Sequence, residues 1–213
     1  MEIAKANFEN SPYIGIFCVA NDNTALIPMC STKKFAGLVK EKLGVEVVKT
    51  TIANTSLISI FCIMNNNKIF VPDIIEKSEL KILKDNFQEV IVLSQKYTAL
   101  GNLVALNDKG AVCSKYLYKT ISKYIKTKSM TIAGSDLIGS CLFVTNKAFL
   151  AHIDTSEKEL KGIEKALKVS GDCGTVNFGD SFVRSGIIGN KRGILTGSLT
   201  SGPELNRIDD IFL

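Results

Sequence analysis

The chain has 213 residues, of which 46% are hydrophobic and 22% charged, and its formal net charge is +5. This composition is ordinary for a folded globular protein; no stretch has the eighteen or so uninterrupted apolar residues of a membrane helix, and the first residues lack the apolar core of a signal peptide. The mild basic bias suits a partner that carries phosphates but does not require one.

The first predicted elements form a β-hairpin. A strand of β-branched and apolar residues begins at Ile14, an Asn/Asp turn follows at residues 21–23, and a second strand ends at Pro28. Alternation of this kind around an Asn-rich turn is typical of a hairpin.

A helix is predicted after this hairpin. Ser31 or Thr32 can cap its N-terminus and Gly44 can end it. A short strand over residues 45–48 then leads onward. The apolar stripe of the helix comprises Phe35, Leu38, Val39 and Leu43.

Further along the chain, residues 68–71 are predicted as the second strand of the next hairpin. Three more helices are predicted from their apolar stripes: Leu117, Ile121 and Ile125; Leu160, Ile163 and Leu167; and Leu205, Ile208 and Phe212. Ser156 and Glu159 form a capping box before the second of these stripes, and Pro203 occupies the first position of the last helix. The first stripe lies within residues 115–128, where lysines alternate with apolar residues. This pattern favours an amphipathic helix with a solvated basic face; a dedicated RNA-binding helix is the alternative.

An internal repeat organises these elements. Residues 14–23 align without a gap on residues 58–67, and further copies begin near 100, 138 and 183. This period of roughly 38–45 residues suits repeat and propeller proteins. We therefore predict that residues 1–213 form a single domain of five quasi-repeats, with inner strands starting near 14, 58, 100, 138 and 183. Since one such unit cannot bury its own sheet and helix, and neither end of the chain looks like a capping repeat, a closed ring is favoured over an open stack.

Four separated motifs then resemble a known family. They are Ala-Asn-Phe-Glu-Asn at residues 6–10 with Ile14-Gly15, Ala-Leu-Gly-Asn at 99–102 followed by Asn107-Asp108, Gly-Thr-Val-Asn at 174–177, and Ser-Gly-Pro-Glu-Leu at 201–205. Their order along the whole chain resembles the translation initiation factor 6 family, in particular its eukaryotic members. The resemblance implies an α/β fold of the pentein type, a five-bladed α/β propeller with pseudo-fivefold symmetry.

The resemblance also implies a function. Such a protein binds the large ribosomal subunit beside the sarcin–ricin loop and a neighbouring ribosomal protein, with some rRNA contact, and prevents premature association with the small subunit. It takes part in large-subunit biogenesis and export, works in the cytoplasm, nucleus and nucleolus, and is evicted by a GTPase and that enzyme's cofactor protein. A monomer without enzymatic activity, cofactor, metal or membrane is expected.

This chain departs from the eukaryotic pattern at two places. It ends at Leu213 without the acidic, phosphorylatable extension of eukaryotic members, so regulation through such a tail is not expected. Ile60 stands where some eukaryotic members carry an arginine that follows an Ile-Gly pair, and the charge contact at that point is absent.

The candidate binding surface is predicted from the quasi-symmetry. Five short segments precede the five inner strands and should lie on one rim of the ring: residues 11–13, 55–57, 97–99, 135–137 and 180–182. Their small residues would leave backbone groups open for strand-like docking of a partner's tail, although they could also be tight turns that lead into the strands, especially where glycine serves backbone geometry.

Asn102 is the leading candidate in this surface. It matches the asparagine that the resemblance places at the ribosomal-protein contact, and an amide can donate and accept at once, although it could instead cap a turn. The full set of predicted ribosome-binding residues is Asn102, Gly101, Leu100, Ala99, Thr98, Tyr13, Gly15, Ile60, Asp136, Ser140 and Arg184.

Two other functions remain open. The first is guanidine modification, because the pentein fold also supports enzymes with a cysteine nucleophile; it needs a thiolate and a histidine acid–base. The single histidine, His152, falls where the first two copies carry Pro28 and Pro72, at the end of an outer strand, and Cys173 is the cysteine in the most glycine-rich setting. The second is a protein-interaction ring whose partner is not the ribosome. The dispersed cysteines contain no Cys-x-x-Cys pair, so we expect reduced core residues of a cytosolic or nuclear protein rather than a metal site.

Overall fold

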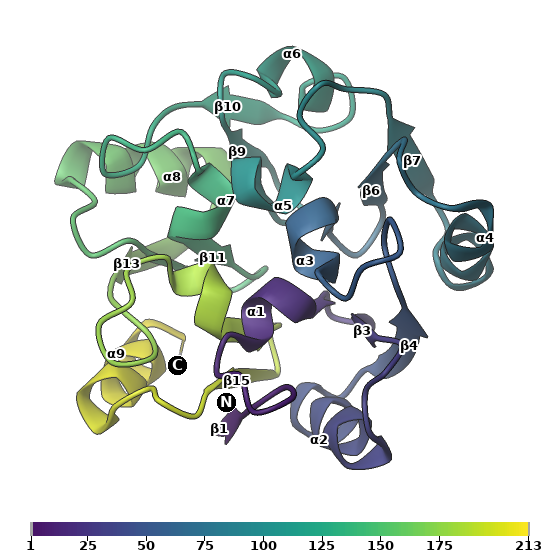
Figure 1. Ribbon diagram of the computed structural model, residues 1–213. Coiled ribbons are helices and arrows are strands. Elements are labelled where there is room, and N and C mark those ends of the chain that lie inside the picture. The colour runs from purple at the N-terminus through teal and green to yellow at the C-terminus, as the bar shows by residue number, and fades with distance from the viewer. Residues whose placement is uncertain (1, 213) are drawn as a thin grey trace.

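Five three-stranded sheets surround a central axis in the computed structural model, which describes residues 2–212 (Figure 1). The predicted five-bladed α/β propeller is confirmed. In four of the sheets an antiparallel hairpin is followed by a helix and a third strand that pairs in parallel with the middle strand; in the fifth sheet the third strand comes from the start of the chain. The strands, sheet by sheet, are β2 (Val19–Ala20), β3 (Thr24–Pro28) and β4 (Glu46–Thr50); β5 (Ile63–Met64), β6 (Ile69–Pro72) and β7 (Val90–Leu93); β8 (Val104–Leu106), β9 (Ala111–Cys113) and β10 (Thr127–Ser129); β11 (Leu142–Val144), β12 (Ala148–Ala151) and β13 (Ser170–Cys173); and β14 (Ile187–Gly189), β15 (Gly193–Gly197) and β1 (Glu2–Ala6).

The ring closes through its N-terminal strand. Strand β1 pairs in parallel with β15, with Glu2 opposite Gly193 and Ala6 opposite Gly197, so the start of the chain supplies the third strand of the fifth sheet. No sequence motif predicts this pairing of the first strand with the last hairpin. The first and last units are thereby joined by backbone hydrogen bonds as well as by side-chain packing, and the predicted closed ring is confirmed.

A single helical turn precedes each inner strand. The five turns are α1 (Ile14–Phe17), α3 (Ile58–Phe61), α5 (Leu100–Leu103), α7 (Ile138–Cys141) and the 3₁₀ turn η1 (Val183–Gly186). The prediction that inner strands start near 14, 58, 100, 138 and 183 is therefore wrong, because the strands begin about four residues later and are two or three residues long. A short continuous apolar run can be a buried strand or a buried helical turn, and periodicity alone does not distinguish them.

Longer helices lie on the outside of the ring (Figure 1). They are α2 (Lys33–Leu43), α4 (Lys77–Asn86), α8 (Glu157–Leu167) and α9 (Gly202–Phe212). Thr32, rather than Ser31, caps α2 by accepting a hydrogen bond from the Phe35 N–H at 3.1 Å, and Gly44 ends it with a φ of 61°. The Ser156–Glu159 capping box of α8 is confirmed, and α9 begins one residue before Pro203.

The helix predicted within residues 115–128 is reduced to one turn, α6 (Tyr118–Ile121). Strand β10 already begins at Thr127, so the connection from β9 is too short for a helix like α2. Leu117 and Ile121 are fully buried as the stripe predicted, while the lysines of this segment remain exposed. The amphipathic pattern is correct and the predicted length is wrong.

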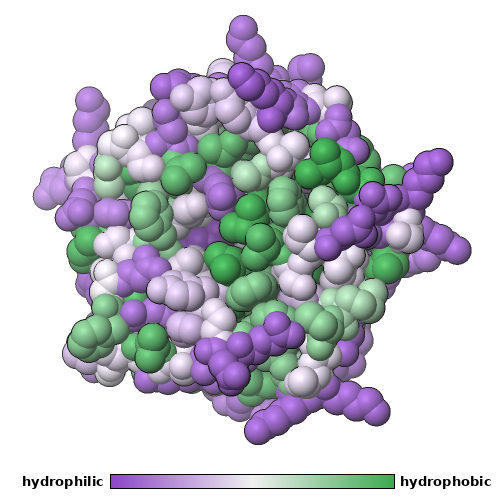
Figure 2. Space-filling model, viewed as in Figure 1, coloured by the Kyte–Doolittle hydropathy of each residue, from purple (hydrophilic) through white to green (hydrophobic). Residues whose placement is uncertain are grey.

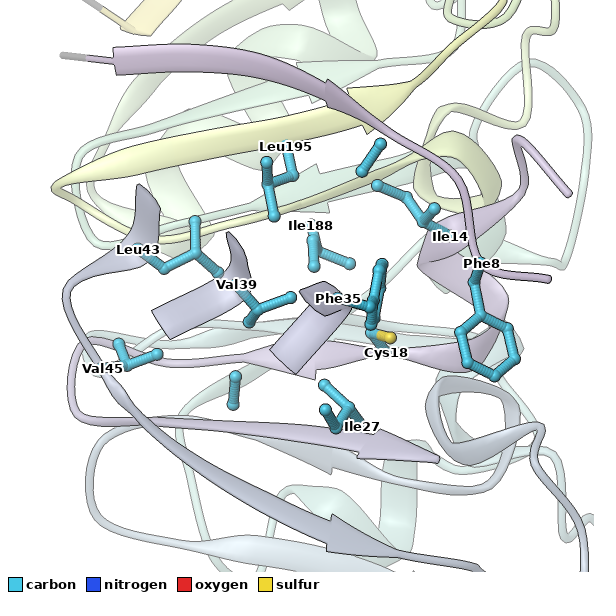
Figure 3. Close-up of a cluster of buried hydrophobic side chains, with 12 residues drawn as sticks. Phe8, Ile14, Cys18, Ile27, Phe35, Val39, Leu43, Val45, Ile188 and Leu195 are labelled. Carbon is cyan, nitrogen blue, oxygen red and sulfur yellow. The ribbon is translucent and has the colours of Figure 1, made fainter. Parts of the chain in front are cut away.

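The hydrophobic core follows the ring in five clusters, and one of them spans the closure. Ile188 and Leu195 from the fifth sheet pack against Val39 and Leu43 of α2, with the buried Cys18 thiol in the same cluster (Figure 3). Since this packing joins units far apart in sequence, the first and fifth units depend on each other for burial.

Two buried glutamates hold the loops that lead to the helical turns. The Glu204 carboxylate accepts hydrogen bonds from the backbone N–H groups of Phe178, Gly179 and Ser201 and from the Thr175 hydroxyl. Burial by itself raises the pKa of Glu204, but these hydrogen bonds outweigh it and lower the pKa to about 2. Glu79 holds the equivalent loop of the second unit in the same way, and its pKa is also lowered.

We expect Glu204→Gln to destabilise the protein by about 2 kcal/mol at neutral pH, since an amide cannot accept all of these hydrogen bonds. A carboxylate whose folded pKa lies below its unfolded value stabilises the fold above the unfolded pKa, and this contribution is lost as the pH falls towards about 2. Chemical denaturation between pH 7 and pH 2 should therefore show a shallower pH dependence for the variant than for the unaltered protein. The exposed Glu157→Gln is the matched control, and equal pH profiles for the unaltered protein and Glu204→Gln would contradict this role.

Candidate functional site

The five helical turns form a continuous face around the axis, nearest the viewer in Figure 1. Each turn contacts the next, and α1 contacts η1 to complete the circle. This close approach depends on glycine: a Cβ added to Gly101 would overlap the Ser59 carbonyl oxygen, and one added to Gly139 would overlap the carbonyl of Gly101. The turns are therefore packed backbone against backbone, and their surface is a rigid platform.

A hydrophobic residue stands at the N-cap of every turn. These five residues are Tyr13, Leu57, Ala99, Leu137 and Phe182. Tyr13, Leu137 and Phe182 are each more than 40% exposed, which is a large apolar exposure for side chains fixed on rigid turns. Figure 2 shows hydrophobic residues near the middle of this face and hydrophilic side chains projecting around its edge.

A pocket of about 210 Å³ opens among these turns. Ile60, Asn102 and Ser140, which occupy the same position in three successive turns, contribute to its lining together with Leu137 and Phe182. The Ser140 hydroxyl donates to Asn102 Oδ1 at 3.2 Å, and the Asn102 Nδ2 group has no partner within residues 2–212. The face thus offers an apolar depression with one unused amide donor, a combination that suits a protein partner.

Three segments of the rim have a backbone amide that is already satisfied. The N–H groups of Tyr13 and Leu137 donate to the hydroxyls of Ser11 and Ser135, at 3.2 and 3.0 Å, and the Phe182 N–H donates to Asp180 Oδ1 at 2.9 Å. The expectation of exposed backbone groups for strand-like docking is wrong for these three amides, because serine and aspartate two residues earlier satisfy them; for residues 97–99 it stays a prediction.

The predicted site residues divide by depth. Leu100 is fully buried, and Gly15 and Gly101 lie beneath the surface where they permit the close packing of the turns. Their side-chain positions therefore face the interior of the ring, so they serve packing in this conformation. The predicted residues that remain accessible, at least in part, are Tyr13, Ile60, Thr98, Ala99, Asn102, Asp136, Ser140 and Arg184.

Sequence reasoning missed several members of the face. Ile16 and Ser185 line the same pocket but were not among the candidates. Leu137 and Phe182 also line it; they belong to the predicted rim segments but were not among the predicted ribosome-binding residues. Ile16 and Ser185 are the equivalents of Asn102 in the first and fifth copies, and Leu137 and Phe182 are the equivalents of Tyr13. Extending each candidate through all five copies would have found them.

Arg184 closes the axis beneath this face. Its guanidinium Nε and Nη2 donate to Ser59 Oγ at 3.1 and 3.0 Å, in the space that the surrounding glycines leave. Burial lowers the pKa of Arg184, and no carboxylate of the described residues forms an ion pair with it. The Arg184 side chain of the fifth copy therefore fills the opening at the axis that a smaller side chain at this position would leave.

The opposite end of the axis is closed by a polar ring. The amides of Asn66 and Asn146 each donate to both Asp22 and Asp108, at 2.7–2.9 Å. Burial raises the pKa of Asp22, but the hydrogen bonds from Asn66, Asn146 and Lys191 outweigh it and lower the pKa. Between this ring and Arg184 remains a cavity of only about 40 Å³, which has room for a few water molecules.

Neither a metal centre nor a membrane segment is found within residues 2–212. No group of three or more histidine, cysteine or acidic side chains is arranged to hold a metal ion. None of the helices in this range combines the length and apolar character needed to cross a bilayer. His152, at the end of β12, lies against the Phe182 ring with centroids 5.8 Å apart.

Comparison with known proteins identifies the fold and the family of the chain. A solved structure of dimethylarginine dimethylaminohydrolase, in an adduct with S-methyl-L-thiocitrulline, has a similar fold, with a TM-score of 0.50 and 12% identity over 80% of this chain and 69% of that one. Translation initiation factor 6 from Pyrococcus abyssi is 34% identical over 99% of this chain and 98% of its own length, and the protein of the same name from Saccharolobus islandicus is 36% identical over 98% and 97%. The model of the eIF-6 family matches residues 3–211. The chain therefore belongs to the eIF-6 family, and its fold is the pentein-type α/β propeller.

Proposed function

We propose that this protein acts in translation initiation by binding the large ribosomal subunit through the face of five helical turns, so that the small subunit cannot join prematurely. The observation that carries the proposal is the apolar ring of N-cap residues around the pocket at Asn102. Family membership supports the translational role, since the relatives carry the name translation initiation factor 6.

Within this proposal, the partner at the face is the ribosomal protein beside the sarcin–ricin loop. Leu137 and Phe182 would be buried against apolar side chains of that protein, and the Asn102 Nδ2 group would donate to one of its carbonyl oxygens. Interfaces of this kind depend on a few central anchors in a desolvated pocket. The rigidity of the turns supports the idea, because a preorganised surface loses little entropy on binding.

The cellular part of the proposal follows from the family alone. The protein would accompany the large subunit during biogenesis and export, from nucleolus and nucleus to cytoplasm, and a GTPase with its cofactor protein would release it. It would act as a monomer, since the five units already close on one another.

We also propose that the protein is not an enzyme, although its fold is shared with guanidine-modifying enzymes. Burial raises the pKa of Cys62 and Cys113 to about 12 and that of Cys141 to about 11, so these thiols stay protonated at neutral pH. The axial cavity is closed by Arg184 and the polar ring and is too small for an arginine-like substrate. A clear deiminase or amidinotransferase activity of the purified protein would contradict this part.

Sucrose-gradient sedimentation tests the binding. The unaltered protein should travel with purified large subunits and reduce their joining to small subunits. Asn102→Ser should weaken co-sedimentation about tenfold, the effect of one interfacial hydrogen bond lost at about 1.4 kcal/mol, with unchanged thermal stability. A protein that stays at the top of the gradient at low salt would point instead to a ring with a non-ribosomal partner.

A further inference from the structure

The net positive charge of this protein comes from one of its five units. Residues 94–135 contain seven lysines and a single acidic residue, Asp108, which is engaged in the polar ring at the axis. The rest of the chain has 19 basic and 20 acidic side chains, so the whole net charge of +5 comes from this unit. The seven lysines, all exposed, are Lys96, Lys109, Lys115, Lys119, Lys123, Lys126 and Lys128.

The same unit is rich in exposed tyrosine. Four of the five tyrosines of the chain lie in it, and each is 37–43% exposed: Tyr97, Tyr116, Tyr118 and Tyr124. The other four units have the same architecture and carry neither the tyrosines nor the one-signed charge, so folding does not require this composition. A function specific to the third unit accounts for it better.

Tyr97 and Tyr116 form a pair at the surface. Their ring centroids are 4.7 Å apart with an interplanar angle of 34°, and the ammonium groups of Lys96 and Lys115 lie 5.8 and 5.2 Å from the centroids of Tyr97 and Tyr116. Lys115 is also held by Asp136 at 3.1 Å, which connects it to the loop before α7. The aromatic faces and the cations are therefore positioned together.

This arrangement fits unpaired RNA. Exposed aromatic rings stack on bases whatever the sequence, and lysines beside them neutralise phosphates along the backbone. An acidic protein would also be attracted by the lysines, but the close placement of aromatic rings and cations matches the bases and phosphates of an RNA strand more directly. Tyr97 also directly precedes Thr98 and Ala99, on the rim of the face of helical turns, so RNA and a protein partner could be bound side by side.

We infer that the outer edge of the third unit, with the Tyr97–Tyr116 pair as a base-stacking platform and the lysines of α6 and its flanks as phosphate contacts, binds single-stranded or looped RNA next to the protein-docking face. This inference rests on the proposed function and assigns its RNA contact to named residues. The edge lies around α6 and β10 in Figure 1, where hydrophilic side chains project in Figure 2.

Fluorescence anisotropy with a short labelled single-stranded RNA, over a series of salt concentrations, tests the lysines. Replacing Lys119, Lys123 and Lys126 with glutamine should lower the slope of log K against log salt by about two, since each phosphate contact contributes about 0.7. The matched control replaces Lys158, Lys161 and Lys165 of α8, which changes the net charge equally on another unit. Equal losses in both triple variants would mean that only net charge matters and would overturn the assigned site.

The tyrosines are tested with the same probe. Tyr97→Ala combined with Tyr116→Ala should weaken binding about 10–100-fold with little change in the salt slope, because stacking of a base contributes about 1–3 kcal/mol. Tyr13→Ala, a tyrosine of similar exposure on the first unit, should bind RNA normally. Unchanged RNA affinity of the double variant would overturn the stacking platform.

Sedimentation with large subunits separates the two proposals. If the unaltered protein binds subunits but neither the double tyrosine variant nor the lysine triple variant weakens that binding at any salt concentration, the RNA site is wrong and the docking face stands. If the unaltered protein binds RNA in solution but not the subunit, the proposed function fails and the RNA site survives.

Discussion

Replacing Gly101 with alanine should destabilise the protein by about 3 kcal/mol and lower its melting temperature by about 10 °C. The added methyl group would overlap the Ser59 carbonyl oxygen of the neighbouring turn, and no rotamer can relieve a clash that begins at Cβ. Because α3 and α5 are themselves packed between other turns, the backbone cannot move away without disturbing the whole ring. Differential scanning calorimetry measures the effect directly.

Gly37→Ala is the matched control for this substitution. Gly37 lies within α2, and a Cβ added there meets no atom within 4 Å. Alanine is the better helix former by about 1 kcal/mol, so this variant should melt at the same temperature or slightly higher. If Gly101→Ala were as stable as Gly37→Ala, the backbone packing of the turns would be far looser than the structure indicates.

The architecture could be predicted from sequence because the same pattern occurs five times. A single apolar run such as Ile14–Phe17 is ambiguous, yet five copies at regular spacing, with no capping repeat at either end, favour a ring whatever each run forms locally. What the repeat could not show was the conformation of these runs. In three of the five turns a glycine packs against a carbonyl oxygen of the neighbouring turn, a contact between units that no local pattern reports.

The pairing of the N-terminal strand with the last hairpin could not be predicted for a related reason. Residues 2–6 pair with β15, from the far end of the chain, and such a pairing leaves no signal in either segment alone. The alternation in residues 45–48 was recognised as a third strand because it follows a helix. The segment at residues 2–6 has the same role, but it precedes the hairpin whose sheet it completes, so no helix before it marks it as a third strand.

The candidate site was predicted in outline from the motif around Asn102, and quasi-symmetry placed it on one rim. The depth of each residue could not be predicted, because Leu100 and Asn102 are two residues apart on one turn and face opposite sides. Arg184 stays a predicted contact residue, since it lines the pocket, but no sequence pattern indicates that it also closes the axis through Ser59, 125 positions away.

Replacing Leu137 with aspartate should abolish most of the binding to the large subunit. Leu137 is 42% exposed at the N-cap of α7 and lines the pocket at Asn102. If it is a central anchor of the proposed interface, its loss costs about 2–4 kcal/mol, a 30- to 1,000-fold weaker affinity. Burying the new carboxylate without a partner would add to this loss. Co-sedimentation over a range of protein concentrations gives the affinity.

The fold should tolerate this substitution, which makes the result interpretable. Leu137 makes no side-chain capping hydrogen bond, and aspartate is among the preferred residues at an N-cap, so the melting temperature should stay the same or rise. Val92→Asp supplies the control: Val92 is 41% exposed on β7, the outer edge of the second sheet, away from the five turns (Figure 1).

The two aspartate variants have the same charge and nearly equal exposure at the substituted position, so a difference between them reports location alone. Weak binding by Leu137→Asp with normal binding by Val92→Asp would place the ribosome at the face of helical turns. Normal binding by both would remove the face from the proposal. The close packing of the turns beneath it would still explain why positions 101 and 139 are glycine. Binding and ring closure are thus separable by experiment, since Leu137 acts at the surface of the turns and Gly101 acts between them.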